Sequence, residues 1–274
     1  MERTRLALGD LVFDALTAGP PEGRLVLLLH GFPQNSTSWQ HVWPGLAAAG
    51  YRVVAPDQRG YSPGARPSAV ANYRMPELVA DVLGLVDQLG AGRADVVGHD
   101  WGAGVAWQVA SRHPDRVRSL AAVSVPHPLA FAEALRTDPD QREKSRYMRL
   151  FQQPGTAEAA LLADGGMDDL FGVCPPETRG YLERMRAPGA LTAALNWYRA
   201  MDRATVEGLR PVRVPTLHVW GDADPALGES ATRASAVHVA APYRLEVLAG
   251  VGHWVPELAP ELLTALLLDH LEAT

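Results

Sequence analysis

The sequence has a single cysteine and almost no lysine. Cys174 is the one cysteine among 274 residues, so neither an internal disulfide nor a cysteine-based metal site can form. Lys144 is the only lysine, and the net charge of −6 comes without any basic block, which argues against a nucleic-acid partner. The nine histidines show no metal-binding spacing. We therefore expect neither a metal ion nor another cofactor.

Long hydrophobic runs are also missing. The C-terminal run Leu262–Leu268 is too short to span a bilayer. The N-terminus lacks the basic region, apolar stretch and small-residue cleavage site of a signal peptide. We expect a cytoplasmic monomer or homodimer with no membrane partner. The composition, 47% hydrophobic and 20% charged, is that of a globular chain with one large domain or a core plus an inserted lid.

Apolar runs and helical patterns alternate along the first half of the chain. Leu25–Leu29 is a continuous apolar run, which is typical of a strand buried on both faces of a parallel sheet. From Met75 to Leu89 apolar residues recur at helical spacing. Similar patterns predict strands over 51–56, 95–97 and 119–124, helices over about 39–49 and 105–111, and an edge hairpin over 6–16. Such alternation predicts an α/β fold with a mostly parallel, doubly wound sheet.

The alternation stops at Pro126 and resumes later. Strands are predicted again over 216–220 and 243–248, and a final helix over 260–271. Between them the pattern is helical, without a convincing strand. We interpret this segment as an inserted cap: the core comprises residues 1–126 and 213–274, and the helical cap or lid comprises 127–212. Ligands bind at the carboxyl ends of strands in open α/β sheets, so we expect the cap to lie there.

The segment Gly98-His99-Asp100-Trp101-Gly102 has the spacing of a nucleophile elbow, a sharp strand-to-helix turn that exposes its central residue. Glycines two positions away on either side remove the Cβ clashes of such a turn. Serine is the usual nucleophile, but Asp100 stands here. A carboxylate can displace a leaving group from an sp3 carbon and form an alkyl-enzyme ester. The residue therefore favours epoxide or carbon–halogen chemistry over ester hydrolysis, with a plain helix cap as the alternative role.

A nucleophile elbow predicts an acid and then a histidine further along the chain. His253 follows the last predicted strand in a Gly-Val-Gly-His context and is our candidate for the base that activates water. Asp224, with Asp222 as the second choice, follows the preceding strand and is our candidate for the carboxylate that orients the imidazole. The ordinary role of an aspartate after a strand is a turn or a helix cap.

Hydrolysis of an ester also needs backbone donors for the tetrahedral oxyanion. The amides of Phe32, after the strand at 25–29, and of Trp101, after the nucleophile, are the expected pair. Their side chains could equally be pocket wall. We predict structural roles for His30 and His99.

These residues resemble those of the soluble epoxide hydrolases of the α/β-hydrolase fold, and the resemblance covers nearly the whole chain. His30-Gly31-Phe32-Pro33 is similar to the family's H-G-x-P oxyanion loop, whose proline is typically cis, and residues 98–102 resemble its aspartate elbow. Two lid segments are the most specific. Arg146–Glu158 resembles Y-x-x-x-F-Q-x-P-G-x-A-E, and Leu195–Met201 contains N-W-Y-R. The resemblance implies an α/β-hydrolase fold with a helical cap, acting on an epoxide and water.

The resemblance also assigns the family's two lid tyrosines to Tyr147 and Tyr198. In the family these side chains hydrogen-bond the epoxide oxygen and supply its proton. A phenol has a pKa of about 10, so it stays protonated at neutral pH and can donate as charge develops on the leaving oxygen. Without the resemblance both would be interpreted as aromatic side chains that pack on a helix face.

Two other functions compete with epoxide hydrolysis. A haloalkane or haloacid dehalogenase on the same fold shares the elbow, the acid and the histidine, and Trp101 could donate its indole hydrogen to a halide. However, Phe32 stands where an asparagine often serves as second halide donor, and residues 101–108 hold no arginine for a haloacid carboxylate. A non-catalytic ligand-binding protein on this fold is less favoured, because no catalytic residue is missing.

Apolar side chains in the cap and near the elbow predict an apolar pocket, and hence an apolar epoxide as substrate. The candidate wall residues are Phe32, Pro33, Trp39, Trp101, Phe131, Phe151 and Trp197, with Met167 and Leu170 as further lid residues.

Overall fold

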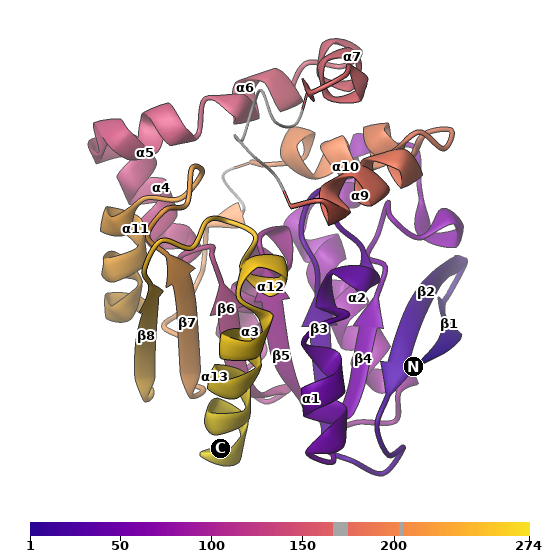
Figure 1. The fold of residues 1–274 in the computed structure, drawn as a ribbon, viewed down its shortest axis with the longest axis vertical. Helices are drawn as coiled ribbons and strands as arrows, with labels where there is room; N and C mark the ends of the chain where they lie inside the picture. Colours follow the sequence, from indigo (N-terminus) through magenta and orange to yellow (C-terminus); the bar gives the residue numbers. More distant parts are fainter. Residues whose placement is uncertain (167–174, 203–204) are drawn as a thin grey trace.

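An eight-stranded sheet forms the centre of the molecule (Figure 1) in the computed structural model, which describes residues 1–166, 175–202 and 205–274. The strand order is β1-β2-β4-β3-β5-β6-β7-β8. The strands are β1 Glu2–Leu8, β2 Leu11–Ala18, β3 Leu25–Leu29, β4 Arg52–Pro56, β5 Ala94–His99, β6 Val117–Val123, β7 Thr216–Gly221 and β8 Tyr243–Leu248. The hairpin β1-β2 is antiparallel, and its strand β2 pairs antiparallel with β4. The six strands β3 to β8 are all parallel to one another. This confirms the predicted sheet with its edge hairpin.

Helices cover both faces of the sheet. In β3, Leu27 and Leu29 belong to the core on one face, and Val26 and Leu28 belong to the core on the other. The first core includes α2 (Met75–Gln88) and α3 (Trp101–Arg112), and the second includes α1 (Trp43–Ala48) and α13 (Pro260–Glu272). Burial on both faces explains the continuous apolar runs of these strands.

Two helix boundaries differ from the prediction. The segment expected as one helix over 39–49 is a 3-10 turn, Ser36–Trp39, followed by α1. The Asn35 side chain accepts the Thr37 N–H and so starts this turn separately. The helix expected from 105 already begins at Trp101, because the elbow passes from strand to helix within one residue.

The helices between β6 and β7 form the cap. Among the described residues they are α4 Pro128–Thr137, α5 Pro139–Lys144, α6 Tyr147–Phe151, α7 Thr156–Leu162, α9 Glu177–Met185 and α10 Ala190–Arg199. Figure 1 shows α5, α6, α7 and α10 above the carboxyl ends of the strands. The described residues of this segment contain no strand. The division of the chain at 126/127 and 212/213 stays a prediction.

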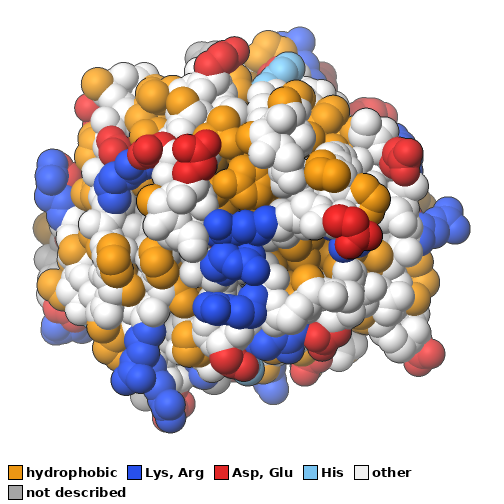
Figure 2. Space-filling model, turned by 90° about the horizontal axis from the view of Figure 1, so that it is seen from below, with side chains coloured by type: hydrophobic (Ala, Val, Ile, Leu, Met, Phe, Trp, Pro, Cys, Tyr) orange, Lys and Arg blue, Asp and Glu red, His pale blue; other side chains and the backbone are white. Residues whose placement is uncertain are grey.

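The amino ends of the parallel strands form the opposite end of the molecule. Seen from this side, charged side chains of both signs are interspersed with hydrophobic ones, and a row of basic side chains lies near the centre (Figure 2). Asp95, at the start of β5, has a fully buried side chain and pairs with Arg24 at 2.6 Å and Arg118 at 3.2 Å. Within the described parts of the chain, no helix is long and apolar enough to cross a bilayer.

Candidate active site

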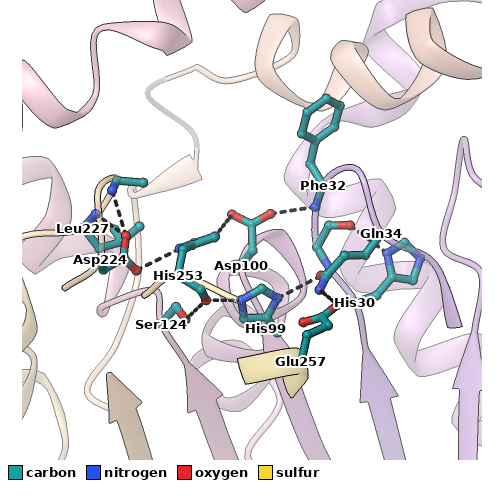
Figure 3. A network of polar contacts seen from close by, with 12 residues as sticks. His30, Phe32, Gln34, His99, Asp100, Ser124, Asp224, Leu227, His253 and Glu257 are labelled. Atoms are coloured by element: carbon teal, nitrogen blue, oxygen red, sulfur yellow. Dashed lines mark hydrogen bonds and ion pairs between the residues drawn. The ribbon is translucent and has the colours of Figure 1, made fainter. Parts of the chain in front are cut away.

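Asp100 occupies a tight turn between β5 and α3. Its φ of 51° and ψ of −122° lie where a residue with a side chain is rarely found. The chain closes so tightly that a Cβ on Gly98 would lie 2.2 Å from the Gly102 carbonyl oxygen, and one on Gly102 would lie 2.1 Å from the Leu29 carbonyl oxygen. Only glycine fits at either position. The turn presents the Asp100 carboxylate, which is largely buried, toward the cap (Figure 3).

His253 lies between two carboxylates (Figure 3). Its Nδ1 is 2.8 Å from Asp224 Oδ2, and its Nε2 is 3.5 Å from Asp100 Oδ2. The other oxygen of Asp224 accepts the N–H groups of Ala226 at 2.7 Å and Leu227 at 3.0 Å. These bonds hold the Asp224 carboxylate so that it fixes the orientation of the imidazole.

The geometry favours Asp224 over Asp222 as the orienting acid. Asp222 Oδ1 instead accepts the N–H of Gly250 at 2.6 Å, and the Asp222 residue is exposed. It serves the turn that brings the His253 loop back to the sheet, which is the ordinary role of an aspartate after a strand.

The two carboxylates control the charge of His253. Burial alone would lower the pKa of the imidazole, but Asp224 and Asp100 outweigh it and raise the pKa to about 10. Burial also disfavours the charged form of Asp100 and would by itself raise its pKa. The contact with His253 and the hydrogen bond from the Phe32 amide instead hold the pKa of Asp100 below its usual value. In the free protein at neutral pH the pair is therefore a carboxylate and an imidazolium.

The loop after β3 supplies a donor to Asp100. The Phe32 N–H donates to Asp100 Oδ1 at 2.7 Å, and the Phe32–Pro33 peptide bond is cis. His30 braces this loop: its Nδ1 lies 2.9 Å from the Gly31 carbonyl oxygen, and its Nε2 accepts the Gln58 N–H at 3.0 Å. Burial lowers the pKa of His30 to about 4, so the ring is neutral and donates through Nδ1.

Of the two predicted oxyanion donors, the Phe32 amide is thus already bonded to Asp100. The Trp101 amide is the first of α3, next to Asp100 in the chain, and its participation stays a prediction. The dipole at the start of this helix also favours negative charge at the site.

The two cap tyrosines line the same cavity as Asp100. Tyr147 begins α6, Tyr198 lies in α10, and their rings are 6.2 Å apart at 77°. Burial and the nearby Asp100 carboxylate raise the pKa of both phenols above the usual value of 10. Both are therefore protonated over the physiological pH range.

The cavity above Asp100 has a volume of about 90 Å³ and is mostly apolar. Of the predicted wall residues, Trp101 and Phe131 line it. The other described lining residues are Met75, Gly104, Gln108, Val125, Pro126, Pro128, Met148, Met201, Thr205 and Leu227, besides Asp100 and the two tyrosines. Gly104 and Gln108 follow Asp100 at helical spacing on α3, which is the one signal in the sequence that could have indicated them.

Of the five predicted wall residues that do not line the cavity, four lie near the site. Phe32, Phe151 and Trp197 are buried and pack behind the cavity, with the Phe32 and Phe151 rings 5.6 Å and 4.9 Å from that of Tyr198. Trp197 donates from Nε1 to the Arg59 carbonyl oxygen at 2.9 Å. Pro33 is buried in the oxyanion loop. Phe32, Phe151 and Trp197 support the wall from behind, through their ring contacts with Tyr198 or Trp101.

Trp39 is a correction. It is fully buried in the core that contains α1 and α13, on the opposite side of the sheet from the core that contains Tyr198. It follows a loop that leaves the active-site edge, and the sequence offers no sign of which face it joins. Met167 and Leu170 lie outside the described residues.

Comparison with known proteins gives concordant matches. A family model described as the alpha/beta hydrolase fold matches residues 24–260. Epoxide hydrolase A of Mycobacterium tuberculosis is 37% identical over 93% of this chain and 92% of its own, and epoxide hydrolase 3 of Xenopus tropicalis is 34% identical over 98% of this chain and 77% of its own. The crystal structure of epoxide hydrolase A from Mycobacterium thermoresistibile is similar with a TM-score of 0.87 and 33% identity, over 99% of this chain and 98% of that one.

Proposed function

The chain belongs to the epoxide hydrolases of the α/β-hydrolase fold, and from this premise we propose that it opens an apolar epoxide to a vicinal diol through an ester formed on Asp100. One observation supports this proposal above the others: the elbow carboxylate lies between an imidazole and a backbone N–H, in a cavity that two phenols also line. A cavity with this apolar lining suits an uncharged, apolar substrate.

In the first half-reaction Asp100 acts as the nucleophile. Oδ2, the oxygen that faces His253, forms a bond to one ring carbon while the bond from that carbon to the ring oxygen breaks. The electron pair goes to the ring oxygen, which takes a proton from Tyr147 or Tyr198 and becomes the first hydroxyl of the diol. Oδ1 keeps its hydrogen bond from the Phe32 amide and becomes the carbonyl oxygen of the ester.

In the second half-reaction His253 takes a proton from a water molecule, whose oxygen attacks the ester carbon. Negative charge develops on Oδ1, where the amides of Phe32 and Trp101 stabilise it. The bond from the carbon to Oδ2 then breaks, and the diol leaves with that oxygen as its second hydroxyl. The remaining proton of the water goes to this hydroxyl, and His253 keeps the proton that it took, which restores the imidazolium of the free protein.

Alkylation itself turns His253 into a base. In the free protein the imidazole faces two carboxylates and is protonated at neutral pH. Once Asp100 is esterified, its charge is gone and only Asp224 still favours the imidazolium. Burial then lowers the pKa of the ring, so the imidazolium passes its proton to the tyrosinate left by the first half-reaction. The phenol is restored, and the neutral His253 can accept a proton from water. The order of the two half-reactions therefore follows from the electrostatics of the site.

A His253→Gln variant tests the covalent step. It keeps the nucleophile and the tyrosines but lacks the base, so the intact protein mass should rise by the mass of one substrate on exposure to an epoxide. His41→Gln, a change at an exposed histidine, is the matched control and should turn over without accumulating an adduct. If the mass stays unchanged with every epoxide that the wild type consumes, the ester mechanism is wrong.

The same assay separates epoxide hydrolysis from dehalogenation, because a dehalogenase would also form the ester but from haloalkanes. We expect adducts and turnover with styrene-type or aliphatic epoxides and release of halide from none of the matched haloalkanes. Halide release at a rate comparable to diol formation would favour the dehalogenase instead.

A further inference from the structure

Glu257 is a buried acid that the reaction scheme does not use. It lies in α12 (Val255–Leu258), four residues after His253. Its Oε1 accepts a hydrogen bond from Gln34 Nε2 at 2.7 Å and another from the Tyr181 hydroxyl at 3.0 Å. Its Oε2 is buried without a hydrogen-bond partner among the described residues. Burying a carboxyl oxygen without a hydrogen-bond partner is energetically unfavourable, so the position of this side chain calls for an explanation.

Gln34 connects Glu257 to the oxyanion loop (Figure 3). The Gln34 side chain is fully buried, and its Oε1 accepts the Gly31 N–H at 3.0 Å. A backbone N–H can only donate, so the amide oxygen must face Gly31 and the amide NH₂ must face Glu257. Glu257 provides the acceptor that this orientation requires.

The bonded Gly31 amide directly precedes the Phe32 amide that donates to Asp100. The peptide between them is held on its other side by His30, whose Nδ1 lies 2.9 Å from the Gly31 carbonyl oxygen. The Gln34 bond to the Gly31 N–H therefore fixes the direction of the Phe32 N–H, which is 2.7 Å from Asp100 Oδ1. A rotation of this loop would point the donor away from the oxyanion.

The same glutamine also reaches the base. Its Oε1 lies 2.8 Å from His99 Nδ1, and His99 Nε2 lies 2.9 Å from the carbonyl oxygen of His253. The Ser124 hydroxyl donates to that carbonyl oxygen at 2.9 Å. One buried network thus contacts the oxyanion donor and the backbone of His253.

We propose that Glu257 is a positioning residue for hydrolysis of the Asp100 ester. By holding Gln34, it keeps the Phe32 N–H directed at Asp100 Oδ1. Through its hydrogen bond with Tyr181 of α9, it makes this alignment depend on the packing of the cap against the core. The inference rests on the proposed ester mechanism. Glu257 affects the second half-reaction, because the full oxyanion charge develops only in that step. Burial raises the pKa of Glu257 to about 7, and in either protonation state Oε1 can still accept from Gln34.

The test separates the two half-reactions. In Glu257→Ala, Gln34 loses its acceptor, and single-turnover measurements should show hydrolysis of the ester slowed about 10- to 100-fold with formation of the ester changed by less than about 3-fold. The ester should then accumulate during turnover, so kcat and KM fall together. Glu257→Gln keeps an acceptor for Gln34 and should restore hydrolysis to within a few-fold of wild type. Glu261→Ala, at an exposed acid on the next helix, is the matched control.

Three outcomes overturn the proposal. Equal slowing of both half-reactions, or a lower Tm with unchanged kinetics, would mean that Glu257 only fastens α12 to the core. Ester hydrolysis in Glu257→Ala that is as fast as in wild type would also rule out the proposed positioning role. If Glu257→Ala does not fold, Gln34→Met removes the same link from its other end and must slow ester hydrolysis selectively. Failure of the ester mechanism itself is recognised separately, by the absence of an adduct in His253→Gln.

Discussion

Replacing Asp100 by asparagine should lower the pKa of His253 by roughly three pH units. Asp100 Oδ2 lies 3.5 Å from His253 Nε2. At this separation two unit charges attract by about 5 kcal/mol for an effective dielectric constant of about 20, and about 1.4 kcal/mol corresponds to one pH unit. Burial opposes the imidazolium, and with both carboxylates present the pKa is raised to about 10. With Asp224 alone, His253 should therefore titrate much closer to neutral pH.

The measurement is a pH titration of the histidine ring resonances by NMR, with His253 assigned by its absence in His253→Gln. In wild type the ring should remain protonated past pH 8, whereas in Asp100→Asn it should lose its proton below that pH. Asp222→Asn is the matched control, because this carboxylate bonds the Gly250 amide rather than the imidazole. Intact mass must show that the introduced asparagine has not deamidated. A His253 pKa that moves by less than about one unit would refute the argument that alkylation of Asp100 creates the base.

Two further predictions concern the cap and the cavity. The double variant Tyr147→Phe, Tyr198→Phe should slow ester formation by about 100- to 10,000-fold, because the ring oxygen then leaves without a proton donor. Its circular dichroism spectrum should match that of wild type. An unchanged rate of ester formation would remove both phenols from the mechanism. Gly104 lines the cavity floor, and a Cβ there would meet only Trp101 Cε3, at 4.0 Å. Gly104→Leu should therefore reduce kcat/KM at least about tenfold for an epoxide with a long apolar arm but not for a short one. Because leucine favours a helix over glycine by roughly 1 kcal/mol, the Tm should not fall. Equal loss for long and short epoxides would place the arm elsewhere.

Much of the fold could be predicted from local patterns. A strand buried on both faces shows an unbroken apolar run, as in Leu25–Leu29, and a helix against the sheet shows its apolar face at helical spacing, as in α2. The elbow glycines were recognisable because their spacing follows from the sharp turn itself, and a Cβ at either would overlap backbone atoms. The starts of the helices at Trp43 and Trp101 were harder to predict from the sequence, because caps and turns shift helix boundaries.

The sequence by itself was enough to predict the class of chemistry. An aspartate at the centre of an elbow, followed in order by an acid and a histidine after later strands, predicts a covalent ester without any knowledge of the packing. The two lid tyrosines became recognisable only through their family resemblance, because a tyrosine on a helix face has the same local pattern whether it packs or donates a proton.

Only the tertiary structure decided which side chains surround the reacting atoms. Trp39 lies on the far face of the sheet, whereas Gly104 and Met201 line the cavity. Gln34 and Glu257 are 223 residues apart in the chain, yet share a hydrogen bond of 2.7 Å. Periodicity reports which face of a helix or strand is buried, but not which distant segment covers that face. Contacts of this kind depend on how the elements meet in space, and no local pattern in the chain records them.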